Sequence, residues 1–166
     1  DLEWNHGLVL DTGLFCTVGE HVWRAGPLRP FVGSSNGRYM GMSIPTALGA
    51  GRVRALPWMC VVGDGGIRMF PSEVRAAVEE RLPICVLLMA DGGYGSIAAS
   101  AGRRSALSVA GAGWTGVFAA MGMEARSIAT ASEFSAVMGS WDRRGPLFVE
   151  LQCDPEAYAA MTQELR

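Results

Sequence analysis

The sequence lacks several features that would assign it to particular protein classes. Its longest apolar runs, such as residues 84–90, are far too short to span a bilayer. Its formal net charge is only −2, so nothing in its charge favours binding to nucleic acid or to an anionic membrane surface. It shows no secretory signal pattern and no initial Met. We therefore expect a cytoplasmic protein that is either trimmed or part of a longer polypeptide.

The four cysteines and two histidines form no recognisable metal or redox motif. No two cysteines make a CxxC pair, and no histidine lies at ligand spacing beside them. We expect four reduced thiols in or near the core. The isolated His6 and His21 are expected to be structural or exposed rather than catalytic.

The chain does contain enough apolar material for one globular core. Hydrophobic residues make up 49% of its 166 positions and charged residues only 18%, which excludes a disordered tail. No internal repeat, low-complexity tract or linker divides it. Residues 1–166 are therefore expected to form a single domain.

Short apolar runs alternate with helical patterns along the chain. The runs are typical of strands buried on both faces of a parallel sheet, and they occupy residues 8–10, 58–62, 84–89 and 147–151. The helical patterns occupy residues 41–51, 71–81, 108–122 and 131–140. This alternation predicts βαβ units. The expected fold class is α/β, with a doubly wound, mainly parallel sheet and helices on both of its faces.

Three of the expected strands end in an aspartate beside glycines. These aspartates are Asp11, Asp64 and Asp91, and the carboxyl ends of neighbouring parallel strands meet where such sheets bind ligands. Glycine lets backbone N–H groups approach an anion, and a helix following Gly66 would add its N-terminal dipole. Acidic side chains at an anion site require a cation between them and the anion. The residues therefore predict a diphosphate site bridged by Mg²⁺.

Each of these turns, taken singly, is weak evidence for a ligand site. A Gly-Asp-Gly sequence is also common in ordinary strand-to-helix turns. The dinucleotide-binding pattern GxGxxG fits poorly, because Arg68 stands where its third glycine belongs.

The spacing of two segments resembles a known family. Gly63-Asp64-Gly65, a helix that contains Pro71-Ser72-Glu73, a buried strand, and then Asp91 to Gly95 resemble the cofactor motif of thiamine diphosphate-dependent enzymes. Similarity extends to residues 11–13, 38–50 and 145–156. The chain resembles the diphosphate-binding (PP) domain of the 2-oxo acid decarboxylase and acetohydroxyacid synthase group. As a separate chain it resembles the small subunit of two-component sulfopyruvate or phosphonopyruvate decarboxylases.

The resemblance implies roles for individual residues. The Mg²⁺ ligands would be the side chains of Asp64 and Asp91 and the backbone carbonyl of Gly93. Met40 would be the apolar wedge under the thiazolium ring, and Arg38 stands where the family has a glycine whose carbonyl accepts the 4′-amino group. The full set of implied cofactor-binding residues is Arg38, Met40, Gly65, Gly66, Tyr94, Gly95 and Ile97.

Asp91 departs from the family pattern, which has asparagine at this position. A carboxylate is a better ligand for a hard cation, but it adds negative charge beside the diphosphate. At roughly 4 Å and an effective dielectric near 20, one charge pair is worth about 4 kcal/mol. We expect that metal dependence is kept and that cofactor affinity depends on pH. The alternative is a degenerate site.

The second departure from the family pattern is that one of its domains is missing from this sequence. In the family, a glutamate on a pyrimidine-binding domain activates the cofactor, and that domain is not within this sequence. Glu73 and Glu79 are expected on a solvated helix face instead. The resemblance thus implies a partner chain in an α2β2 or larger hetero-oligomer, without which this chain is inactive. Residues 41–51 and 114–123 are candidate interfaces, with ordinary core packing as the alternative.

The implied reaction is decarboxylation of a small 2-oxo acid, with or without carboligation, because the cofactor carries that chemistry. Two alternatives stay open: a split transketolase or 2-oxo acid dehydrogenase component, and a degenerate regulatory partner without catalysis. Arg103 and Arg104 lie in a segment after the cofactor motif. They could attract an anionic substrate or simply belong to a solvated loop.

Overall fold

The fold comes from a computed structural model, which describes residues 5–33, 39–101, 108–109, 113–157 and 160. Arg38, Arg103 and Arg104 lie outside the described residues. No helix within the described part of the chain is both long and apolar enough to cross a membrane.

The described residues form a six-stranded sheet in which all neighbouring strands run parallel. The strand order is β2-β1-β3-β4-β6-β5. The strands are β1 (Gly7–Leu10), β2 (Phe31–Val32), β3 (Trp58–Gly63), β4 (Ile84–Ala90), β5 (Glu124–Ile128) and β6 (Leu147–Gln152). This confirms the predicted α/β fold.

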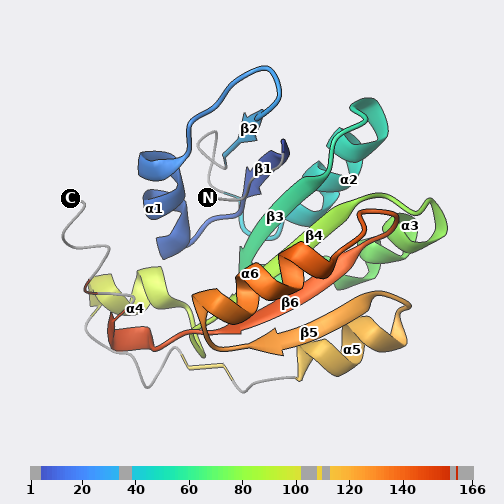
Figure 1. The fold of residues 1–166 in the computed structure, drawn as a ribbon. Coiled ribbons are helices and arrows are strands. Elements are labelled where there is room, and N and C mark those ends of the chain that lie inside the picture. The colour runs from blue at the N-terminus through green and yellow to red at the C-terminus, as the bar shows by residue number, and fades with distance from the viewer. Residues whose placement is uncertain (1–4, 34–38, 102–107, 110–112, 158–159, 161–166) are drawn as a thin grey trace.

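Helices cover both faces of the sheet (Figure 1). They are α1 (Leu14–Val22), α2 (Ser43–Val53), α3 (Val74–Glu79), α4 (Gly95–Ala101), α5 (Trp114–Ala120) and α6 (Ala131–Ser140). One face packs against α2, α3 and α5, and the other packs against α1 and α6. The sheet is therefore doubly wound, as its hydrophobic runs predict.

Alternate residues of each strand supply two separate hydrophobic cores. Cys60 and Val62 of β3 face α2, α3 and α5, whereas Met59 and Val61 face α1 and α6. On the first face, the rings of Phe118 and Phe148 stack with centroids 4.2 Å apart. Such stacking stabilises the fold by about 1 kcal/mol beyond the contribution of the buried apolar area.

The two segments named as possible interfaces turn their large apolar side chains inward. Ile44 and Leu48 of α2 are buried in the core, as are Trp114 and Phe118 of α5. The outer face of α2 stays open, since a Cβ added at Gly49 would meet nothing within 4 Å. Core packing therefore accounts for these four side chains, whereas Met42 of the first segment is 43% exposed.

The structure corrects the predicted helix after Gly66. Residues Gly66–Arg68 and Pro71–Glu73 form two short 3-10 turns, and the α-helix begins only at Val74. The helix expected to follow Gly66 is therefore a single 3-10 turn, and the longer α-helix lies farther along the chain. Helix α6, in contrast, spans the predicted 131–140, because Thr130 and Glu133 form a capping box at its start.

Several elements were missed in the sequence for physical reasons. Strand β5 lies at the sheet edge and is largely polar and exposed, so it lacks a hydrophobic run. Strand β2 has only two residues. Helices α1 and α4 begin at the glycine turns of Gly13 and Tyr94-Gly95. Glycines in such turns are typical of loops, so the sequence did not indicate a helix there.

Candidate functional site

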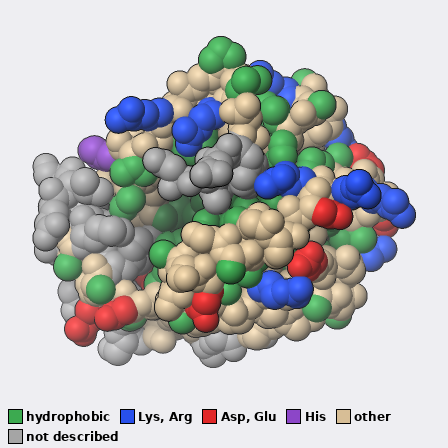
Figure 2. All heavy atoms as spheres, in the orientation of Figure 1, with side chains coloured by type: hydrophobic (Ala, Val, Ile, Leu, Met, Phe, Trp, Pro, Cys, Tyr) green, Lys and Arg blue, Asp and Glu red, His purple; other side chains and the backbone are tan. Residues whose placement is uncertain are grey.

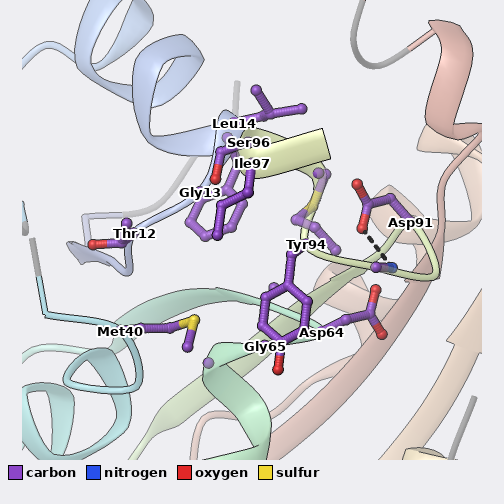
Figure 3. A pocket seen from close by; sticks show the side chains of 16 residues that line it. Thr12, Gly13, Leu14, Met40, Asp64, Gly65, Asp91, Tyr94, Ser96 and Ile97 are labelled. Carbon is purple, nitrogen blue, oxygen red and sulfur yellow. Dashed lines mark hydrogen bonds between the residues drawn. The ribbon is translucent and has the colours of Figure 1, made fainter. Parts of the chain in front are cut away.

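A cavity of about 260 Å³ lies at the carboxyl ends of β1, β3 and β4. This is where the strand order reverses, because β2 and β3 flank β1 on opposite sides. Doubly wound sheets bind ligands at such switch points. The predicted convergence of the turns after these strands is therefore what the structure shows (Figure 3).

Asp64 is a buried carboxylate held by the turn that follows β4. Its Oδ2 accepts a hydrogen bond from the backbone N–H of Gly92 at 2.9 Å. Its Oδ1 accepts none that involves the described residues, and Asp64 lines the cavity. The Asp64 side chain is thus a largely buried charge at the wall of a cavity, and it is suited to a cation, because burial of a charge is costly unless the charge is paired.

Asp91 lies in the turn after β4, next to Gly92, whose N–H donates to Asp64. Its Oδ1 accepts from the N–H of Gly93 at 3.3 Å. A Cβ added at Gly95 would lie 2.3 Å from Asp91 Oδ2, so the glycine gives this carboxylate its space. Figure 3 shows the carboxylates of Asp64 and Asp91 beside the same stretch of backbone.

No group of three or more His, Cys, Asp or Glu side chains that could hold a metal occurs in the described residues. Two carboxylates alone do not complete the shell of a hard cation. A metal here would need backbone carbonyls and ligand oxygens in addition to Asp64 and Asp91. The predicted donor set, in which Gly93 contributes its carbonyl, stays a prediction.

Met40 and Tyr94 converge on Gly65 (Figure 3). A Cβ added at Gly65 would lie 2.6 Å from Tyr94 Cε1 and 2.8 Å from Met40 Sδ. The turn after β3 is therefore packed between two large side chains at the wall of the cavity and has no room for a Cβ. Only glycine lets the backbone of this turn lie so close to the cavity, and backbone N–H groups of such a turn can bind an anion.

Asp11 organises the site from beneath, a role that the sequence did not reveal. Its side chain is fully buried. It accepts hydrogen bonds from the N–H of Gly41 at 2.9 Å, the hydroxyl of Ser43 at 2.8 Å and the N–H of Thr12 at 2.6 Å. A Cβ at Gly66 would lie 2.8 Å from its Oδ2. Asp11 thus ties together the turns that follow β1 and β3 and the turn that carries Met40.

The structure brings nearly all the predicted site residues to one cavity. Its walls include the predicted Met40, Asp64, Gly65, Gly66, Asp91, Gly93, Tyr94, Gly95 and Ile97. Only Arg38 lies outside the described residues. Ser96, within the segment Tyr94 to Ile97 that the resemblance implies at the diphosphate, lines it too. Residues that also line it and were not predicted as site residues are Thr12, Gly13, Leu14, Phe15, Gly63 and Met89. Thr12 to Phe15 could have been found from the Asp-Thr-Gly turn after the first strand.

The chain is similar to proteins of one cofactor family. Residues 11–151 match the family model described as thiamine pyrophosphate enzyme, C-terminal TPP binding domain. The chain belongs to this family. Thiamine pyrophosphate is the same compound as thiamine diphosphate, so the match agrees with the site that the geometry describes.

Solved structures of thiamine diphosphate enzymes share the fold. One, from Mycobacterium smegmatis and assigned as a thiamin diphosphate-dependent enzyme, has a TM-score of 0.73 and 17% identity. The match covers 89% of this chain and 28% of that one. Benzoylformate decarboxylase from Polynucleobacter necessarius has a TM-score of 0.76 and 18% identity, over 93% of this chain and 31% of that one. No curated protein sequence matches the chain.

This member of the family therefore spans about 30% of the length of these two structures. Residues 11–151 of it match the C-terminal TPP binding domain of the family.

We predict that Gly65→Ala weakens thiamine diphosphate binding by roughly tenfold or more. The new methyl group would displace Tyr94 or Met40 and cover the N–H groups of the turn; the loss of one good charge-assisted hydrogen bond costs about 1.5–3 kcal/mol. Calorimetric titration with the cofactor and Mg²⁺ measures the effect.

Gly49→Ala is the matched control for this prediction. Gly49 lies within α2 with open space around it, so alanine should leave cofactor affinity unchanged and stabilise the fold by about 0.5–1 kcal/mol. Equal cofactor affinity in Gly65→Ala and Gly49→Ala would contradict the assigned role of the Gly65 turn.

The structure confirms that the described chain holds four free cysteines, three of them buried. Burial raises the pKa of the Cys60 thiol to about 12, and burial with the nearby charges of Asp91 and Asp64 raises the pKa of Cys153 to about 11. A thiol whose pKa is higher in the folded state binds its proton more tightly there. Its contribution to stability is complete below the unfolded pKa and is lost as pH rises above it.

We therefore predict that the free energy of unfolding falls between about pH 9 and pH 11. Each such thiol contributes a slope of up to about 1.4 kcal/mol per pH unit. Urea unfolding at pH 7.5, 9 and 10.5 tests this. Cys60→Ala should have a shallower alkaline slope than the unsubstituted chain, and an identical slope would contradict the assignment to Cys60.

Proposed function

We propose that this chain is the diphosphate- and Mg²⁺-binding part of a thiamine diphosphate-dependent enzyme that decarboxylates a 2-oxo acid, with or without carboligation. The observation that carries the proposal is the pair of carboxylates, Asp64 and Asp91, on two neighbouring glycine turns at the cavity. The similarity of fold to a benzoylformate decarboxylase supports the reaction class.

The residues present fit such a cofactor. Asp64, Asp91 and the carbonyl of Gly93 would hold Mg²⁺, and the Asp64 oxygen that accepts no hydrogen bond from the described residues would be one of its ligands. The N–H groups of Gly65 and Gly66, together with residues 94–97, would hold the diphosphate. Met40 projects into the cavity and would support the cofactor's thiazolium ring (Figure 3).

The bound cofactor supplies addition to a carbonyl and storage of the resulting negative charge. This chain's residues bind and orient the cofactor. The apolar side chains of Leu14, Phe15, Met89 and Ile97 line the cavity and would exclude water from it. Exclusion of water strengthens the interactions of the charged groups that remain.

The proton-handling acid is proposed to come from a pyrimidine-binding domain on a partner chain. Asp64 and Asp91 are the acidic side chains that line the cavity, and both are committed to the proposed metal. Glu73 and Glu79 are exposed, and Glu79 pairs with Arg75 at 3.3 Å, so neither faces the site.

An exposed apolar surface beside Met40 supports such a partner. Tyr39, Met42, Met69 and Phe70 are each more than a third exposed. Gly41 brings two of their segments together, because its backbone packs against the Met69 side chain. Exposed apolar surface next to a ligand site is typical of an interface.

Calorimetric titration with thiamine diphosphate and Mg²⁺ tests the proposed function. The chain is titrated together with the polypeptide that carries the pyrimidine-binding domain, with and without EDTA. We expect saturable binding that EDTA abolishes, and carbon dioxide release from a 2-oxo acid only when both parts are present. Absence of cofactor binding in the presence of the partner would overturn the proposal.

A further inference from the structure

Glu150 is a buried carboxylate that the proposed cofactor site does not use. It lies on β6 and is 8% exposed. Because alternate residues of a strand share a face, Glu150 points to the same side of the sheet as Phe148, which packs in the core beside α5. The acidic side chains visible on the opposite side, which Figure 2 shows, lie at the surface, as carboxylates usually do. Burial of a charge is costly unless it is paired, so the partners of Glu150 indicate its role.

The partners of Glu150 hold the first turn of α5. Its Oε2 accepts from the N–H of Thr115 at 3.0 Å and from the Thr115 hydroxyl at 2.7 Å. Its Oε1 accepts from the side-chain amide of Gln152 at 3.2 Å. The residue before the helix is Gly113, which has no side chain to cap it. A carboxylate from a distant strand therefore takes the place of a local cap and fixes where α5 begins.

The chain reaches α5 from a segment that pairs with the proposed metal-binding turn. Ser108 forms an isolated antiparallel bridge with Gly93. The N–H of Val109 donates to the carbonyl of Gly92 at 2.8 Å. The N–H of Gly92 in turn donates to Asp64 at 2.9 Å. Gly92 is thus bonded on one side to a proposed metal ligand and on the other to the segment that precedes α5.

A second contact joins the start of α5 to the turn after β3. Trp114 is the first residue of α5 and is buried in the core. The guanidinium of Arg68 lies 5.7 Å from the centre of the Trp114 ring, which is within the range of a cation–π contact. Arg68 ends the 3-10 turn that follows Asp64. A shift at the start of α5 would therefore disturb both turns that carry the proposed metal ligands.

We propose that Glu150 is a positioning residue for the metal site: by fixing the start of α5, it holds the turns of Asp64 and Gly92 in place. Glu150 does not line the cavity, so it acts through these turns and not by contact with the cofactor. The identity of the ligand rests on the proposed function, whereas the coupling of Glu150 to the Gly92 turn can be measured in the chain alone. Groups that orient a metal ligand without touching the metal change metal affinity by about 10–100-fold.

The test compares Glu150→Ala with Glu133→Ala. Glu133 also caps a helix, because its carboxylate accepts from the N–H groups of Ala129 and Thr130 at the start of α6. It is exposed and does not line the cavity. Both substitutions remove a capping carboxylate, and circular dichroism checks that both variants fold. Glu150→Gln is the conservative variant, because its amide oxygen can still accept from Thr115.

Amide hydrogen exchange in the chain without cofactor measures the coupling. Exchange of the Gly92 N–H is taken relative to that of the core amide of Val62, which corrects for a general loss of stability. We expect this ratio to be about fivefold or more higher in Glu150→Ala than in Glu133→Ala, because the turn opens more often. Glu150→Gln should restore slow exchange. Thr115→Val, which removes only the hydroxyl donor, should show a smaller increase and serves if Glu150→Ala does not fold. Equal ratios in the Glu150 and Glu133 variants would overturn the inference.

Calorimetric titration with Mg²⁺ and thiamine diphosphate, with the partner polypeptide present, measures the effect on the site. We expect affinity to fall about tenfold in Glu150→Ala and to stay within about threefold of the unsubstituted chain in Glu133→Ala and Glu150→Gln. If Glu150→Ala and Glu133→Ala bind the cofactor equally well, the positioning role is overturned while the proposed function stands. If the exchange ratios differ as expected but no form of the chain binds the cofactor, the proposed function fails while the coupling of Glu150 to the Gly92 turn stands.

Discussion

Replacing Asp64 with alanine is expected to reduce the affinity for thiamine diphosphate and Mg²⁺ by about 100-fold or more. Loss of a residue that merely orients a metal ligand costs 10–100-fold, so loss of a direct ligand should cost at least as much. Asp64 is buried, and one of its oxygens is already taken by the N–H of Gly92. The remaining oxygen is the one that the metal would need. Calorimetric titration, with the partner polypeptide present, measures the loss.

Two further variants distinguish an effect on metal binding from an effect on folding. Asp64→Asn keeps a side-chain oxygen for the N–H of Gly92 but removes the charge, so it should fold normally and still bind the cofactor poorly. Asp154→Ala removes an exposed carboxylate just after β6, at the same end of the sheet but outside the cavity, and should bind normally. If Asp64→Asn kept full affinity with Mg²⁺, the carboxylate would not be the ligand.

Asp11→Ala is expected to lower the free energy of unfolding by about 3 kcal/mol or more. It would leave the N–H groups of Gly41 and Thr12 and the hydroxyl of Ser43 without their acceptor. Each buried polar group without a partner costs about 1–3 kcal/mol. Because these groups hold the turn that carries Met40, cofactor affinity should fall as well. Urea unfolding gives the first effect and calorimetry the second.

Asp142→Ala is the control for this prediction. Asp142 is exposed and accepts one hydrogen bond from the N–H of Arg144, far from the cavity. Its loss should change stability by less than about 1 kcal/mol, as is usual for surface positions. A stability loss in Asp11→Ala no larger than that in Asp142→Ala would show that Asp11 does not organise the site.

The sheet was predictable because its central strands are buried on both faces. Continuous apolar runs, such as 58–62 and 84–89, need no tertiary information to be recognised as strands of a parallel sheet. Strand β5 was not predictable in this way. Its residues are mostly exposed, and only pairing with β6 makes it a strand.

The helix after Gly66 shows a second limit of sequence patterns. Residues 71–81 have helical periodicity, but the structure has 3-10 turns before an α-helix that begins only at Val74. Pro71 restricts the preceding Phe70 to non-helical backbone angles, so no helix runs through Phe70 into this segment. Periodicity alone does not reveal where a helix starts.

Some features of the candidate site were likewise predictable from the sequence, and others were not. Asp64 and Asp91 were predictable because each ends a buried strand beside glycines, and strand ends of a parallel sheet meet at one edge. The sequence by itself therefore determined the fold class, the edge of the sheet at which the candidate site lies and the candidate metal ligands. Only the tertiary structure decided that Asp11 lies beneath three turns. This depends on which distant segments pack together, and local sequence does not contain that information.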